Sequence, residues 1–129
     1  MTTTNRKLYW TGWVISILPC LLFVFSAILK LQGGPELDKG FGHLGLPVSM
    51  RIPLAILELT CVVVYLIPAT SVLGAILTTG FIGGAIVTHW RSGDAFYVHI
   101  VMGIMIWLGL YLREPHLREL IPLRRNAIA

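Results

Sequence analysis

The chain has 129 residues, of which 56% are hydrophobic and only 12% are charged, and its mean hydropathy is +0.80. A soluble domain carries roughly a quarter charged residues, so this composition indicates a membrane protein. Each transmembrane helix needs about 20 residues, so several helices leave too little chain for a soluble catalytic domain. The net charge of +4 comes from basic residues beside the apolar segments. This placement is typical of topology determinants and lipid contacts and not of a nucleic-acid interface.

The first apolar segment extends from residue 9 to 31 and is interrupted only by Pro19 and small polar side chains. Neighbouring helices can satisfy such groups in a membrane, so we expect the first transmembrane helix here. The segment follows a short basic start, as in a signal peptide, but it is longer than a typical signal core and has no small-x-small cleavage site after it. We therefore expect a signal anchor that is retained.

Residues 32–50 form the one long polar connection between apolar segments, and they are rich in glycine and proline. Glycine and proline break helices, so we expect a loop. The apolar residues of this loop suggest that it folds back onto the mouth of the helix bundle. They are Leu37, Phe41, Leu44 and Leu46.

Three further apolar segments follow, at residues 52–67, 72–90 and 95–112. The turn at Pro68 is too short for anything other than an antiparallel hairpin, and residues 91–94 make the next turn. The tail after the last segment is expected at the membrane interface, with its apolar side chains toward lipid. The sequence predicts an all-α, polytopic membrane protein, an antiparallel bundle of four transmembrane helices in a single domain of residues 1–129.

The balance of lysine and arginine predicts the orientation of the bundle. With an even number of spans, both termini lie on the same side of the membrane. The basic residues of that side are Arg6, Lys7, Arg113, Arg118, Arg124 and Arg125, and those of the opposite side are Lys30, Lys39, Arg51 and Arg91. This excess predicts a multi-pass protein of the cell membrane with both termini in the cytoplasm.

Glu58 needs a physical explanation because it lies inside the second apolar segment. A carboxylate at the centre of a membrane helix costs about 2.5–3.5 kcal/mol on insertion scales. At ~1.5 Å per residue, Glu58 lies about 10 Å below the outer end of its span. We expect its carboxylate to lie close to Lys30 or to a histidine.

Four other polar side chains fall in the same outer half of the predicted bundle. Lys30 closes the first span, and Arg51 opens the second. His89 closes the third span, and His99 lies one turn into the fourth. With Glu58 they could converge on one outward-opening pocket that binds a ligand, exchanges a proton or meets a quinone headgroup. The structural alternative is that Glu58 pairs with Lys30 or a neutral histidine only to fix the order of the helices.

Residue spacing in the first two spans predicts which helix faces point toward this pocket. In the second span, steps of seven place Arg51, Glu58 and Tyr65 on one stripe, with Cys61 beside it. In the first span, alternating steps of three and four define one face. Its residues are Trp13, Ser16, Cys20, Phe23, Ala27 and Lys30.

The third span is rich in glycine, at positions 74, 80, 83 and 84. The small-xxx-small arrangement of these glycines lets another helix approach closely. We expect them to pack inside the same bundle, so that Gly84→Leu would lower the stability. A homodimer interface is the alternative.

Metal and thiol chemistry have weak support in the sequence. Glu58, His89 and His99 offer suitable donor atoms, but no close HxxxH or ExxH pair accompanies them, so we expect no metal and no cofactor. Cys20 and Cys61 lie singly inside apolar segments, without the paired-thiol spacing of redox sites. We expect both to act as small buried apolar residues.

Residues 58–94 resemble the core of the DoxX-like family. The resemblance rests on a glutamate in the second span, a Pro-x-Thr hairpin, Leu-Gly-Ala and Gly-Gly-Ala in the third span, and a Thr-His pair followed by a basic residue and glycine. It extends over nearly the whole chain and includes Ser-Ala-Ile-Leu-Lys-Leu at residues 26–31. It implies a four-helix integral membrane protein with cytoplasmic termini, and it makes Lys30, Glu58 and His89 the leading site residues.

The resemblance implies two different classes of function. The family takes its name from a small subunit of a thiosulfate to quinone oxidoreductase, and a similar branch in animals includes an assembly chaperone of nicotinic receptors. We expect contact with membrane lipids and binding of a small lipid-like molecule or quinone, or a role as accessory subunit of a membrane oxidoreductase. The alternative is a membrane scaffold or assembly chaperone with a purely structural Glu58 network, acting with a second copy or another membrane protein. Family likeness alone does not decide between these classes.

Overall fold

The structure, a computed structural model, describes residues 5–124, and every regular element in that range is helical. Arg125, which was counted for the orientation, lies outside the described residues. The all-α prediction is confirmed. The elements are α1 (Arg6–Gln32), α2 (Pro35–Leu44), the short 3-10 helix η1 (Val48–Met50), α3 (Arg51–Leu66), the 3-10 helix η2 (Pro68–Thr70), α4 (Ser71–Arg91), α5 (Tyr97–Arg113) and α6 (Pro115–Arg118).

Three helical segments are long and apolar enough to cross a membrane. They are Arg6–Gln32, Val48–Leu66 and Pro68–Arg91. Helix α5 is also apolar but has only 17 residues, which is about 26 Å of helix at ~1.5 Å per residue. Large apolar side chains are exposed along all four of these helices, as expected where a helix faces lipid.

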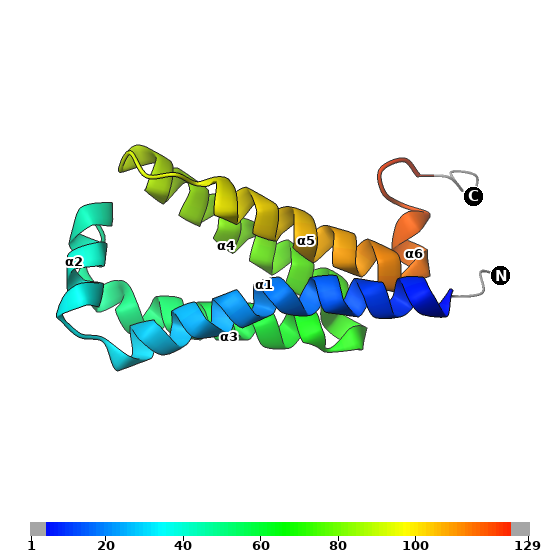
Figure 1. The fold of residues 1–129 in the computed structure, drawn as a ribbon, viewed down its shortest axis with the longest axis horizontal. Coiled ribbons are helices and arrows are strands. Elements are labelled where there is room, and N and C mark those ends of the chain that lie inside the picture. The colour runs from blue at the N-terminus through cyan, green and yellow to red at the C-terminus, as the bar shows by residue number, and fades with distance from the viewer. Residues whose placement is uncertain (1–4, 125–129) are drawn as a thin grey trace.

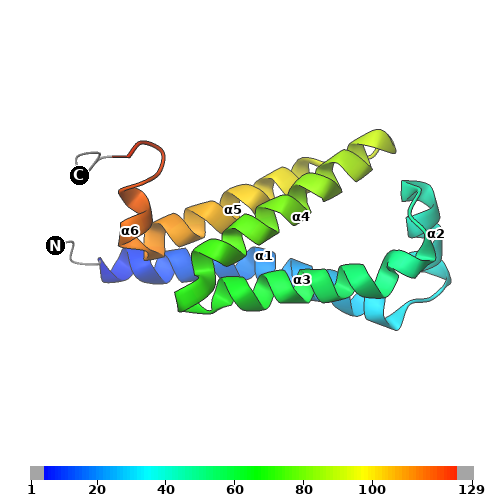
Figure 2. The same ribbon diagram turned by 180° about the vertical axis from the view of Figure 1, so that it is seen from behind.

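The long helices form two adjoining pairs, α1 with α3 and α4 with α5. Helix α1 packs against α3 and α5, and α4 packs against α3 and α5. Both ends of the described chain lie at one end of the molecule, called here the termini end (Figure 1). Helix α2 lies across the opposite end, called here the α2 end, where the α4/α5 pair diverges from the α1/α3 pair (Figures 1 and 2).

The faces predicted for the first two spans are buried at most of their positions, whereas Trp13, Lys30 and Arg51 on these faces are half-buried. On α1, Ser16, Cys20, Phe23 and Ala27 are all buried. On α3, the same holds for Glu58, Cys61 and Tyr65. The periodic spacing of these residues therefore identifies the sides of α1 and α3 that face the rest of the bundle.

Helix α2 is a departure from the loop expected at residues 32–50. Gly40 and Gly42 lie inside this helix, and Pro35 takes its first position, where a missing N–H is tolerated. Gly45 follows the last turn with φ of 74°, a left-handed conformation that glycine adopts easily. Phe41 is buried, which confirms that the segment folds back onto the bundle.

The prediction for the glycines of the third span is wrong for three of the four. A Cβ atom on Gly74 would lie 2.3 Å from the backbone of Tyr65, so this glycine does permit close packing of α4 on α3. Gly80, Gly83 and Gly84 have nothing within 4 Å of the corresponding position. These three glycines face away from the bundle, so Gly84→Leu is not expected to disturb its packing.

Candidate functional site

Lys30 and Glu58 form an ion pair between α1 and α3. The Nζ atom of Lys30 lies 2.5 Å from Oε1 of Glu58. The side chain of Glu58 is 2% exposed and that of Lys30 is 13% exposed, so the ion pair is almost completely buried. The expected closeness of Glu58 to Lys30 is confirmed.

Ser26, which was not predicted as a site residue, completes this pair. It lies one turn before Lys30 on α1, and its hydroxyl accepts a 2.6 Å hydrogen bond from Lys30 Nζ. The same hydroxyl donates to Glu58 Oε1 over 3.3 Å. The three side chains therefore satisfy one another's hydrogen bonds. The positive charge of Lys30 and the negative charge of Glu58 balance each other.

Arg51 lies beside this group but bonds to backbone instead of to Glu58. Its Nη1 atom donates to the carbonyl oxygen of Lys30 and, over 3.0 Å, to that of Leu31. The last carbonyl groups of a helix lack hydrogen-bond donors within the helix. Arg51 supplies a donor to two of these carbonyl groups at the end of α1. This contact also fixes the end of α1 to the start of α3.

His89 and His99 come together on the other helix pair. Their rings stack with centroids 4.6 Å apart. The Nδ1 atom of His89 lies 3.6 Å from one carboxylate oxygen of Asp94, and Nε2 of His43 lies 2.8 Å from the other. The hydrogen bond with His43 is the main cause that lowers the pKa of Asp94 below its ordinary value.

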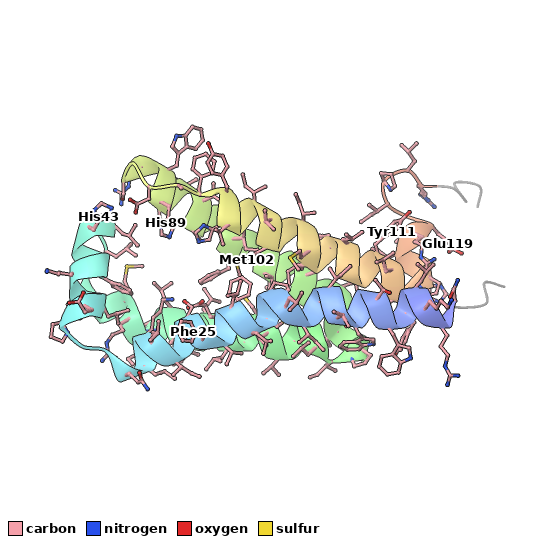
Figure 3. The ribbon with its side chains drawn as sticks, in the orientation of Figure 1. Phe25, His43, His89, Met102, Tyr111 and Glu119 are labelled. Atoms are coloured by element: carbon pink, nitrogen blue, oxygen red, sulfur yellow. The ribbon has the colours of Figure 1, made fainter. Side chains whose placement is uncertain are left out.

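Asp94 and Arg91 attach α2 to the turn between α4 and α5. His43, which contacts Asp94, belongs to α2, and Figure 3 shows it at the edge of α2 nearest the end of α4 that carries His89. Arg91 Nη2 donates a 2.8 Å hydrogen bond to the carbonyl oxygen of Leu44, the last residue of α2. Neither attachment was predicted from the sequence.

The five predicted site residues thus fall into two groups. One contains Lys30, Glu58 and Arg51, and the other contains His89 and His99. Within residues 5–124, no hydrogen bond or ion pair joins the two groups. The physical reason is the divergence of the two helix pairs at the α2 end, which Figure 1 shows. Convergence of all five side chains on one ligand stays a prediction.

A groove of about 570 Å³ lies between α4 and α5, and apolar side chains make up most of its lining. His99 lies at the end of the groove near α2, and Leu117 of α6 lies at the other end. His99 has a buried Nδ1 atom without a hydrogen-bond partner. Midway, Trp107 donates a 2.7 Å hydrogen bond to the hydroxyl of Thr79, so the wall of the groove is held across the two helices.

Arg113 forms a second buried polar group, at the termini end. This residue was expected among the topology determinants, but it is only 7% exposed. Its guanidinium donates to the hydroxyls of Ser16 and Ser71 and lies over the rings of Trp13 and Tyr65. Ser16 and Tyr65 lie on the two predicted packed faces, which was the one sequence signal for a polar contact here.

The described residues contain neither a cluster of metal-binding side chains nor a pair of bonded cysteines. Between residues 5 and 124, no group of three or more His, Cys, Asp or Glu side chains is arranged to hold a metal ion. Cys20 and Cys61 are both buried and unpaired. The two thiols are therefore part of the packed interior.

Comparison with known proteins gives one match. The family model described as the DoxX-like family matches residues 14–112, which include α3 and α4, most of α1 and nearly all of α5. No curated protein and no solved structure matches the chain.

Proposed function

The chain belongs to the DoxX-like family, and on this premise we propose that it binds a lipid-like molecule, of the quinone type, in the groove between α4 and α5. In this proposal α1, α3, α4 and α5 cross the membrane as an antiparallel four-helix bundle. The protein acts by holding its ligand at the lipid boundary, either alone or as an accessory subunit of a membrane oxidoreductase.

The observation that carries the proposal is the groove itself. Its volume of about 570 Å³ lies within the range of roughly 300–1,000 Å³ that is common for ligand pockets. An apolar wall suits an alkyl or isoprenoid tail. His99 at one end supplies a hydrogen-bonding group for a polar head, next to the stacked ring of His89.

Filling the groove should abolish binding. A Cβ atom on Gly103 would lie 3.8 Å from the side chain of Ile82, an ordinary contact, so Gly103→Leu adds bulk to the groove without a backbone clash. We expect this change to weaken binding of a decyl-substituted benzoquinone by about tenfold or more. The measurement is quenching of Trp107 fluorescence in a variant with Trp10, Trp13 and Trp90 replaced by phenylalanine.

Gly84→Leu is the matched control, because Gly84 is also on a long helix but has open space around it. It should bind the quinone as the parent does. Equal quenching in the Gly103→Leu and Gly84→Leu variants would contradict binding in the groove. A quinone or other lipid recovered in stoichiometric amount from purified protein would support it independently.

A scaffold or assembly chaperone is the second candidate function. It is favoured by the Lys30, Glu58 and Ser26 group, whose members satisfy one another and leave no free charge for a ligand. Such a group ties α1 to α3 whatever else the protein does. Purification of a stable protein partner in place of a bound lipid would favour this function.

The proposed orientation places both termini in the cytoplasm, because the basic residues are in excess at that end. The test uses the Cys20→Ser, Cys61→Ser background with one new cysteine, either at position 38 in α2 or appended to the C-terminus. An impermeant thiol reagent added outside cells should label the cysteine at position 38 and spare the one at the C-terminus. The reverse pattern would overturn the orientation.

A further inference from the structure

Arg113 is the last residue of α5, and its side chain lies inside the termini end of the bundle. Its guanidinium carbon is 4.1 Å from the centre of the Trp13 ring and 5.0 Å from that of Tyr65. The residue is only 7% exposed. A permanently charged group is therefore almost completely buried at this end.

The hydrogen bonds of this guanidinium are incomplete. Nε donates to the Ser16 hydroxyl over 3.1 Å, and Nη1 donates to the Ser71 hydroxyl over 3.3 Å. Nη2 is buried and has no partner. In the part of the chain that the structure describes, no carboxylate lies within ion-pair distance of Arg113. The two aromatic faces attract the cation, but they do not accept the in-plane N–H groups of Nη2.

Two other basic residues differ from Arg113 because their charged groups have partners or remain partly exposed. Lys30 is compensated by Glu58 at 2.5 Å. Arg118, at the same end as Arg113, donates to the carbonyl oxygens of Tyr111 and Leu112 and is only half-buried. A buried charge without a counter-charge is strongly unfavourable, so Arg113 lacks a partner that its surroundings require.

We propose that Arg113 binds a phosphate-type oxyanion through Nη2, contributed by a lipid headgroup or by phosphate from solution. The planar fork of a guanidinium fits phosphate oxygens well. At the end of α5, Arg113 is at the level where the apolar span meets the headgroup region of a bilayer. The site does not depend on the groove between α4 and α5.

The charge balance of the termini end supports an anion as the partner. Its described basic residues outnumber its acidic ones: they are Arg6, Lys7, Arg113, Arg118 and Arg124, against Glu114 and Glu119. Glu114 accepts a hydrogen bond from the backbone N–H of His116, so its carboxylate is used at the start of α6. The half-buried Trp13 ring lies over the guanidinium carbon, and entry of an anion to the buried Nη2 requires side chains around it to move.

The test measures thermal unfolding in a neutral detergent, followed by a thiol-reactive dye that reports exposure of the buried Cys20 and Cys61. The parent protein is compared in phosphate and in chloride at equal ionic strength, and with phosphatidylglycerol or phosphatidylcholine added to the micelles. We expect the oxyanion to raise the Tm of the parent by several degrees. Arg113→Gln should abolish this rise, and Arg118→Gln, the matched loss of charge, should retain it.

Each outcome has a distinct meaning. A rise with phosphatidylglycerol alone identifies a lipid headgroup, and a rise with inorganic phosphate as well identifies a site for the free anion. Arg113→Lys keeps the charge but loses the fork, and it should give a smaller rise than the parent. It replaces Arg113→Gln if that variant does not fold. No rise in the parent, or an undiminished rise in the variants of Arg113, would overturn the proposal.

Discussion

Replacing Gly74 by alanine is expected to destabilise the protein more than any other single-methyl addition on α4. The new Cβ atom would lie 2.3 Å from both Cα and the backbone nitrogen of Tyr65, and backbone atoms cannot turn aside as a side chain can. Overpacking of this kind costs about 1–3 kcal/mol. We expect a lower Tm in detergent, measured by labelling of the buried cysteines.

Gly84→Ala is the control for this change, since it makes the same substitution on the same helix where nothing lies within 4 Å. Alanine favours a helix over glycine by roughly 1 kcal/mol in water, so the control should unfold at the same temperature as the parent or a higher one. If Gly74→Ala and Gly84→Ala behave alike, α4 does not approach α3 as closely as described.

Lys30→Met should be the second strongly destabilising change, because it leaves the Glu58 carboxylate buried without a cation. Breaking a buried ion pair by removing one partner costs about 3–5 kcal/mol. Glu58→Gln should also destabilise, since it leaves the Lys30 ammonium beside a neutral amide. The free energy of unfolding of each variant, measured in a denaturant series, tests both expectations.

The double variant Lys30→Met, Glu58→Gln should recover part of the loss, because no lone charge is left inside the bundle. Lys39→Met on α2 removes an exposed lysine and serves as the control, with stability near that of the parent. Additive losses in the double variant would exclude a direct pair. A Glu58→Gln protein of parent stability that no longer retains its ligand would favour a ligand-binding role for Glu58.

Sequence periodicity predicted the packed faces of α1 and α3 because buried residues must recur every three or four positions on a helix. The high cost of a carboxylate in a membrane helix likewise predicted a partner for Glu58, and Lys30 fills that role. Both features are local, since each depends on the residue pattern of one helix or on the need of one residue for a partner.

Features that depend on how helices approach one another were missed. The glycines of α4 look alike in the sequence, yet only Gly74 meets another backbone, because α4 leaves α3 toward the α2 end. Arg113 resembles Arg118 in its sequence surroundings, and the approach of α1, α3 and α4 buries it. Helix α2 was missed for a different reason, since Pro35 and Gly45 break helices but here delimit one.

The unequal lengths of the long helices have a consequence for the surrounding lipid. Helix α1 has 27 residues and α5 has 17, which correspond to about 40 Å and 26 Å of helix. A helix longer than the hydrocarbon layer of about 30 Å tilts, and a shorter one thins the bilayer beside it. In the proposed bundle, α1 is therefore tilted and the membrane is thinnest along α5. The protein should accordingly be most stable in lipids with short acyl chains and should collect in the thinner regions of a membrane.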